Sequence, residues 1–118
     1  MSDVLLADLW SFRDVGPADE VRRLLEDALA AEKADAGRGS PGVNTLLSIA
    51  ALESMAGRDA AATAALDRAF SRSALPWRFR PYLPWFDRLQ GRPEYRVLLA
   101  RWDAARNEAR QRVLTDQD

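Results

Sequence analysis

The side chains that could perform chemistry in this 118-residue chain are few, and none has the neighbour that catalysis requires. The chain has no Cys and no His, which removes thiolate nucleophiles, imidazole bases and the commonest zinc ligands. The acidic pairs at 19–20 and 26–27 are adjacent, so on a helix their carboxylates point apart and cannot act as an acid–base pair. The single lysine, Lys33, lies among acidic residues, and no Ser or Thr has an evident activating base. We therefore predict no catalytic residue, no metal site, no cofactor and no enzymatic activity.

Two further patterns could bind anions. The glycine-rich stretch 37–42 lacks the Lys-Ser/Thr end of a phosphate-binding loop, so we interpret it as a turn between helices. A basic stripe follows near the C-terminus, formed by Arg96, Arg101, Arg106, Arg110 and Arg112. Glu94, Asp103 and Glu108 interrupt this stripe and the whole chain has a net charge of −1, which argues against nucleic acid as a partner. Nucleic-acid binding through the stripe stays a remote alternative.

Composition is that of an ordinary folded domain, with 47% apolar and 30% charged residues. The first residues carry no basic segment followed by a long apolar run, and no stretch approaches the roughly 20 apolar residues of a membrane span. We expect a cytoplasmic protein with no membrane contact. Sixteen arginines against one lysine, with abundant alanine, suggest a GC-rich bacterial coding sequence.

The charges are distributed unevenly between the two parts of the chain. Residues 1–71 contain 12 acidic and seven basic side chains, whereas residues 72–118 contain six acidic and 10 basic ones. Such opposite charges suit head-to-tail contact between copies of the chain, or a partner with a charge gradient. The alternative is an ordinary solvated surface.

Apolar spacing predicts helices over residues 4–13, 17–36, 43–56, 60–73 and 93–113, and no segment alternates as a strand does. Gly57 ends the third helix, and Asp59 is expected to cap the fourth. Alanines at 50, 62 and 69 should let helices approach closely. The fold class is therefore all-α, in a single domain.

Residues 74–92 differ from the rest because three prolines prevent one continuous helix. Five of the ten aromatic residues lie within residues 77–86. We interpret this cluster as the core of a terminal cap, since helical arrays need an atypical last unit to cover their apolar end. If it is exposed instead, it would form a partner-binding patch.

The same residue types recur 41 residues apart at three pairs of positions, which are Gly16 and Gly57, Leu25 and Leu66, and Ala28 and Ala69. Internal periods of about 20–50 residues are typical of stacked helical units. Residues 43–73 resemble the tetratricopeptide repeat, a helix–turn–helix unit, through Leu46, Ile49, Ala50, Gly57, Ala62, Leu66 and Ala69. Residues 2–36 look like a lengthened preceding hairpin, and residues 74–115 look like a degenerate capping unit. The pattern departs from the family at Glu53, where an aromatic residue is usual, and at Pro84.

This resemblance implies a helical solenoid of about two hairpins plus a cap, with a concave face that binds a peptide or helix of a regulatory partner. Register along the first helix of each unit assigns to that face Asp3, Leu6, Trp10, Arg13, Asn44, Leu47, Ala51, Ser54, Arg78, Trp85 and Arg88. The family's clamp for C-terminal carboxylates needs Lys and Asn where this chain has Leu47 and Ala51, so that mode is not expected. For residues such as Trp10 and Leu47, core packing between units is the alternative. We expect a non-catalytic protein–protein interaction module. A self-assembling structural module is the second hypothesis, in which the exposed end of helix 4–13 stacks on another copy.

Overall fold

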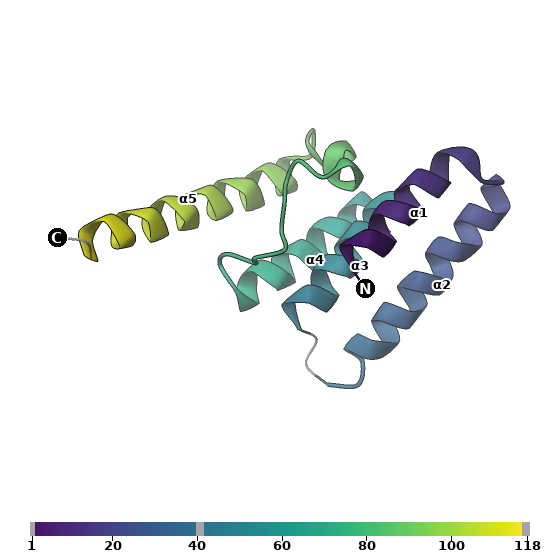
Figure 1. The fold of residues 1–118 in the computed structure, drawn as a ribbon, viewed down its shortest axis with the longest axis horizontal. Coiled ribbons are helices and arrows are strands. Elements are labelled where there is room, and N and C mark those ends of the chain that lie inside the picture. Colours follow the sequence, from purple (N-terminus) through teal and green to yellow (C-terminus); the bar gives the residue numbers. More distant parts are fainter. Residues whose placement is uncertain (1, 40–41, 117–118) are drawn as a thin grey trace.

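A computed structural model describes residues 2–39 and 42–116, and within them every regular element is helical (Figure 1). The elements are α1 (Asp3–Val15), α2 (Ala18–Ala36), α3 (Val43–Met55), α4 (Asp59–Arg72), the 3₁₀ helix η1 (Pro84–Leu89) and α5 (Pro93–Asp116). The all-α prediction is confirmed. The predicted turn at 37–42 lies partly outside the described residues, because these leave out Ser40 and Pro41.

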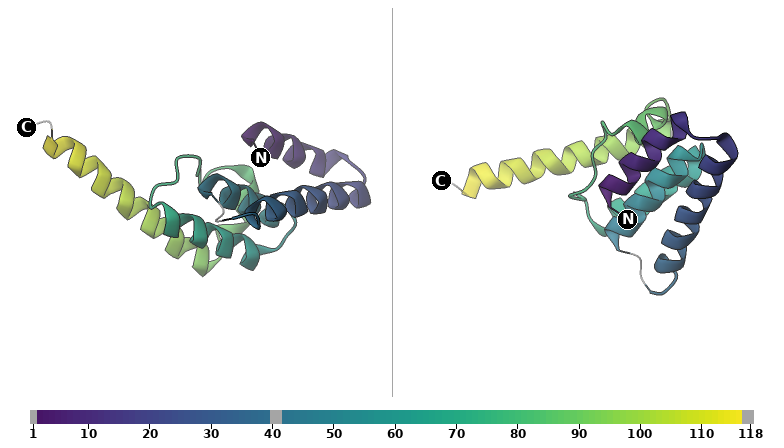
Figure 2. Two further views of the ribbon diagram at one scale, coloured as in Figure 1. Left: turned by 90° about the horizontal axis from the view of Figure 1, so that it is seen from below. Right: turned by 45° about the vertical axis from the view of Figure 1, so that its right-hand side comes forward.

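Helix α3 is the centre of the molecule and packs against α1, α2, α4 and η1. Every residue from Leu46 to Met55 is buried, which explains why this helix is apolar around most of its circumference. Ala50 on α3 and Ala62 and Ala69 on α4 are completely buried, as expected for small residues that let helices approach closely. Figures 1 and 2 show α1 and α2 at one end of the molecule and the tip of α5 at the other.

The α3–α4 turn has the backbone conformation that Gly57 predicts. Gly57 has a φ of 81°, in the left-handed region that side chains with a Cβ rarely adopt. Its N–H donates to the carbonyl of Ser54, and the N–H of Arg58 donates to the carbonyl of Glu53. These two bonds form a Schellman motif, which satisfies carbonyls at the end of α3. Gly16 has a different role, since its φ is negative and a Cβ there would lie 2.5 Å from the ring of Phe12.

The buried carboxylate of Glu53 connects α3 to its neighbours. Lys33 of α2 and Arg58 of the α3–α4 turn each place a nitrogen 3.4 Å from its Oε1 atom. Burial of a charge is tolerated only with such partners. The residue that departs from the repeat pattern is therefore an ion-pair centre within the helix packing.

The aromatic cluster of residues 77–86 divides into buried and exposed members. Phe79 packs edge-on against Phe70 at 5.0 Å and against Trp102 at 5.4 Å between ring centroids, and Trp85 and Phe86 are also buried. Trp77 and Tyr82 are instead 71% and 74% exposed. The cluster therefore contributes Phe79, Trp85 and Phe86 to the core and leaves Trp77 and Tyr82 exposed.

Helix α5 begins against the body and ends in solvent. Tyr95 and Leu98 in its first turns are buried, whereas residues 110–116 are exposed. The helix extends beyond the others, in a molecule that measures 57 × 32 × 25 Å (Figures 1 and 2). Within the described ranges, no helix combines the length and apolar character that crossing a bilayer would need.

Candidate protein-binding surface

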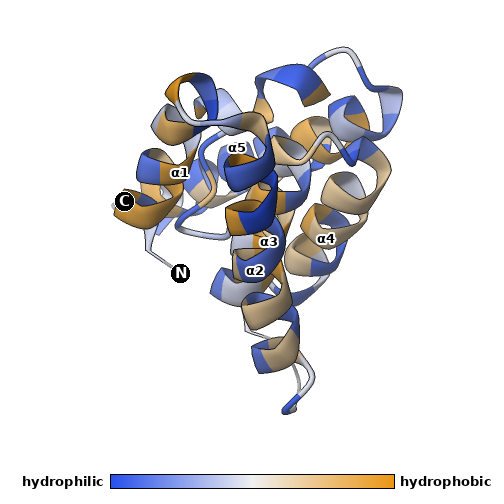
Figure 3. Ribbon diagram, turned by 90° about the vertical axis from the view of Figure 1, so that its right-hand side faces the viewer, coloured by the Kyte–Doolittle hydropathy of each residue, from blue (hydrophilic) through white to orange (hydrophobic). Residues whose placement is uncertain are grey.

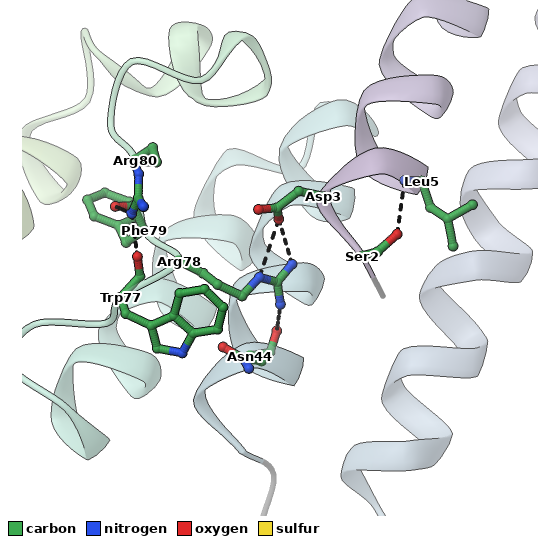
Figure 4. Close-up of polar contacts among 8 residues, drawn as sticks. All are labelled: Ser2, Asp3, Leu5, Asn44, Trp77, Arg78, Phe79 and Arg80. Carbon is green, nitrogen blue, oxygen red and sulfur yellow. Dashed lines mark hydrogen bonds and ion pairs between the residues drawn. The ribbon is translucent and has the colours of Figure 1, made fainter.

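Three of the residues assigned to the concave face, Asp3, Asn44 and Arg78, meet in one contact. Arg78 Nη2 donates to a carboxylate oxygen of Asp3 at 2.7 Å, and its Nη1 donates to the backbone carbonyl of Asn44 at 3.2 Å (Figure 4). Three segments that are distant in the sequence are joined at this point, namely α1, α3 and the segment before η1.

The apolar members of that face are packed against one another and are not open to a ligand. Leu6, Leu47, Ala51 and Trp85 are buried and line a cavity of about 10 Å³, which is no larger than a single water needs. Ser54, a polar residue assigned to the same face, is also buried, and its hydroxyl donates to the carbonyl of Trp85. The structure therefore places these five residues in the core, as in the alternative interpretation.

The four remaining assigned residues keep some exposure but do not form a groove together. Arg13 stacks over the ring of Trp10, with its guanidinium carbon 3.5 Å from the ring centroid, and both side chains are half-buried. Asn44 is exposed beside Arg78. Arg88 is engaged at the other end of α3 with Asp59.

Asp59 does not cap α4 as predicted, because its side chain turns to the C-terminal third of the chain. Arg88 Nε donates to one carboxylate oxygen at 2.9 Å, and Arg92 donates to the other through Nη2 at 2.8 Å and Nε at 3.1 Å. Burial raises the pKa of this carboxyl, but hydrogen bonds and charge from Arg92 and Arg88 outweigh burial and hold the pKa below its usual value. The cluster clamps α4 to η1 and to the start of α5.

A hollow of about 540 Å³ lies between α4 and α5, next to this clamp. Two ion pairs line it, Arg92–Asp59 and Arg101–Asp67, each with a closest distance of 2.8 Å. A ligand that used these charges would have to break pairs that already satisfy each other. We therefore do not choose this hollow as the candidate site.

The open apolar surface lies on the outer side of α1 and α2, and we call it the outer groove. It is a hollow of about 480 Å³ lined by Leu5, Asp8, Leu9, Phe12, Leu24, Asp27 and Ala28. Leu5 is 52% exposed and Leu24 is 37% exposed, although both are large aliphatic residues. Figure 3, which views this end of the molecule, shows hydrophobic and hydrophilic residues interleaved along both helices.

The outer groove exists because each of its helices carries two apolar stripes. On α1, Leu6 turns inward to α3, while Leu5, Leu9 and Phe12 follow the spacing i, i+4, i+7 on another face. On α2, residues 21, 25 and 29 form the buried stripe, and Leu24 is displaced from it. Sequence reasoning missed this groove. The signal that could have revealed it is the i, i+4, i+8 series of residues 21, 25 and 29, which leaves Leu24 outside the buried stripe.

The charge around the outer groove has one sign. Asp8 from α1 and Asp27 from α2 line it, and its lining contains no basic residue. The segment 2–36 that builds this end of the molecule carries nine acidic and four basic side chains. An apolar hollow with a carboxylate on each helix fits an amphipathic helix that has basic residues on both sides of its apolar stripe.

No protein-family model, no curated protein and no solved structure matches the chain. The function proposed below is therefore based on the geometry of the outer groove.

Proposed function

We propose that this protein is a non-catalytic protein–protein interaction module that binds a basic amphipathic helix in the outer groove. The observation that carries the proposal is the exposure of Leu5 and Leu24 in a hollow of about 480 Å³ whose charged lining residues are acidic. Helix-in-groove recognition uses this combination, with apolar anchors for affinity and flanking charges for orientation. The partner-binding face proposed here is the outer side of α1 and α2, in place of the concave face expected from the resemblance.

We also propose that the helices form a tetratricopeptide-like array of two hairpins and a cap. The contacts support this arrangement, since α3 packs against both helices before it and against α4 and η1 after it, and α4 packs against α5. The Schellman turn at Gly57 and the buried alanines of α3 and α4 provide the close packing that stacked hairpins need. In such an array, neighbouring units stack through apolar faces, and the outer side of α1 and α2 carries an apolar surface of this kind.

The titratable groups that are most perturbed serve the fold, which supports the non-catalytic assignment. Asp59 is held ionised between two guanidinium groups that occupy both of its oxygens. Burial, with a smaller effect of the Asp87 charge, raises the pKa of the Tyr95 phenol far above its usual value. A carboxylate that stays charged and a phenol that stays protonated do not exchange protons near neutral pH.

The test is a titration of the full chain with a synthetic peptide that has leucines at i, i+4 and i+7 and arginines on both sides of that stripe. We expect binding that weakens with salt and that falls at least tenfold in Leu24→Arg, which places a charge in the groove. Val15→Arg is the matched control, because Val15 is 82% exposed on α1 and is not among the lining residues.

Circular dichroism should show that both variants stay helical. A wild-type protein that does not bind the peptide, or a folded Leu24→Arg variant that binds as tightly as Val15→Arg, would overturn the proposal.

A further inference from the structure

The C-terminal half of α5 is a second unpartnered surface, at the opposite end of the molecule from the outer groove (Figures 1 and 2). Residues 110–116 are exposed, and Val113 is 57% exposed although it continues the apolar side of the helix. At about 100° per residue, Ala105, Ala109 and Val113 share one face. Ala105 and Ala109 are half-buried, and Ala105 lines a hollow with Phe70 and Ala74, so Val113 is the most open member of this stripe. An extended helix of this kind is marginal on its own in water, because helices in proteins are stabilised mainly by packing of an apolar face.

Arginines border this apolar stripe on both sides. At the same helical spacing of about 100°, Arg106 and Arg110 lie on one side of the stripe and Arg112 lies on the other. Arg106 folds back over Trp102, and Arg112 pairs with Glu108 within the helix at 2.5 Å, so Arg110 is the side chain most open to a new partner. Residues 72–118 as a whole carry 10 basic and six acidic side chains.

We propose that the occupant of the outer groove is the C-terminal half of α5 from a second copy of this chain. The proposal rests on the function proposed above and names the partner. The stripe of Ala105, Ala109 and Val113 would face the apolar floor, and its two alanines would let the helix approach closely. Asp8 and Asp27 stand on the two helices of the groove, and the open Arg110 of the entering helix is opposite to them in sign. Arg112, on the other side of the stripe, would exchange its ion pair with Glu108 for one of these carboxylates.

The contact has to be between two molecules. Helices α1 and α2, which line the outer groove, and the tip of α5 lie at opposite ends of the long axis, whose extent is 57 Å (Figure 1). Because the base of α5 is held by Asp59 and by buried Tyr95 and Leu98, the helix cannot fold back to its own groove. Each copy then offers one groove and one helix, which gives head-to-tail rings or open chains. A single helix in a shallow groove is a small interface, so the association should be reversible and dependent on concentration.

The experiment is sedimentation velocity on the full chain and on two variants that each block one side of the contact. Leu24→Arg blocks the groove and leaves the helix, and Val113→Glu blocks the helix and leaves the groove. We expect wild type to form species larger than a dimer that dissociate in high salt. Each variant alone should be monomeric, and an equal mixture of the two should form a heterodimer and nothing larger.

Leu114→Glu is the matched control, since Leu114 is 53% exposed, adjacent in sequence and about 100° around the helix from the stripe. It should assemble like wild type. A wild type that stays monomeric at all concentrations, or a mixture of variants that forms no heterodimer, would overturn the proposal. The two proposals can fail independently. If wild type stays monomeric but the synthetic basic peptide binds, and Leu24→Arg weakens that binding, the outer groove binds helices but not α5 of a second copy.

Discussion

Replacing Asp59 with Asn should destabilise the protein more than the same substitution at Asp67, the other α4 carboxylate that pairs with an arginine of the C-terminal segment. The substitution keeps the shape of the side chain and removes the charge that Arg88 and Arg92 share. The carboxylate side chain is only 9% exposed, whereas the two arginines are 51% and 56% exposed. The cluster is therefore intermediate between a buried network and a surface pair.

The magnitude follows from that position. Hydrogen bonds to charged groups contribute about 1.5–3 kcal/mol each when buried, and exposed pairs contribute about 0–1 kcal/mol. For a half-exposed cluster we expect Asp59→Asn to lower the free energy of unfolding by about 1–2 kcal/mol. In a chain of this size, that corresponds to a fall in melting temperature of roughly 3–10 °C.

The assay is thermal unfolding followed by circular dichroism, with Asp67→Asn as the control. Asp67 forms the other α4–α5 ion pair, with Arg101 at 2.8 Å, but its side chain is 58% exposed. Loss of that pair should change the free energy of unfolding by less than about 0.5 kcal/mol. A double-mutant cycle between Asp59→Asn and Arg92→Gln should show a coupling, because the two groups interact directly.

The pH dependence of stability tests whether the ionised carboxylate of Asp59 causes the expected loss. Because the folded-state pKa of Asp59 is lowered, its contribution to stability is present above the unfolded carboxyl pKa of about 3.9 and is lost as the pH falls through the folded value. The difference in melting temperature between wild type and Asp59→Asn should shrink on acidification below about pH 4. Equal effects of Asp59→Asn and Asp67→Asn at pH 7, or a difference that grows in acid, would refute the reasoning.

Three further substitutions test the packing, each measured by chemical denaturation. Gly57→Ala should lower the free energy of unfolding by about 1–2 kcal/mol because it forces a Cβ into the left-handed region, whereas Gly91→Ala, with open space around it and no positive φ, should be neutral or stabilising. Ala62→Leu should cost about 1–3 kcal/mol by overpacking the α3–α4 contact; no loss would show that the helices can separate freely. Phe79→Ala should cost about 3–5 kcal/mol, while Trp77→Ala should cost less than about 0.5 kcal/mol, and similar losses would contradict the division of the aromatic cluster.

Local signals in the sequence were sufficient for the helices. Apolar spacing and glycine turns placed five helices within a few residues of their observed ends, and the turn at Gly57 adopts the conformation that glycine permits. The largest difference at a single helix end is at α5, which continues to Asp116. These features are determined by residues that are close together in the sequence, so they can be predicted from the sequence alone.

Features that depend on tertiary packing were harder to predict. Asp59 has the type and position of a helix cap, but two arginines about 30 residues away compete for its carboxylate and bind it. Leu47 and Trp85 were assigned to a binding face by register alone, which fixes the direction of a side chain but not whether another helix covers it. Predicting the exposure of Leu24 required knowing that none of the described helices covers the outer side of α1 and α2.

The anchorage of α5 gives the protein a lever arm. At 1.5 Å per residue the 24-residue helix is about 36 Å long, so tilting it by about 10° at its base would move its tip by about 6 Å. The base is held by the contact of Arg92 with Asp59 and by buried Tyr95 and Leu98, so a small rearrangement at this contact would be amplified at the far end. A partner bound to the tip of α5 would in turn exert a torque on the contacts of Asp59. The stiffness of the Asp59–Arg88–Arg92 cluster would then limit how far an assembly joined through α5 can bend.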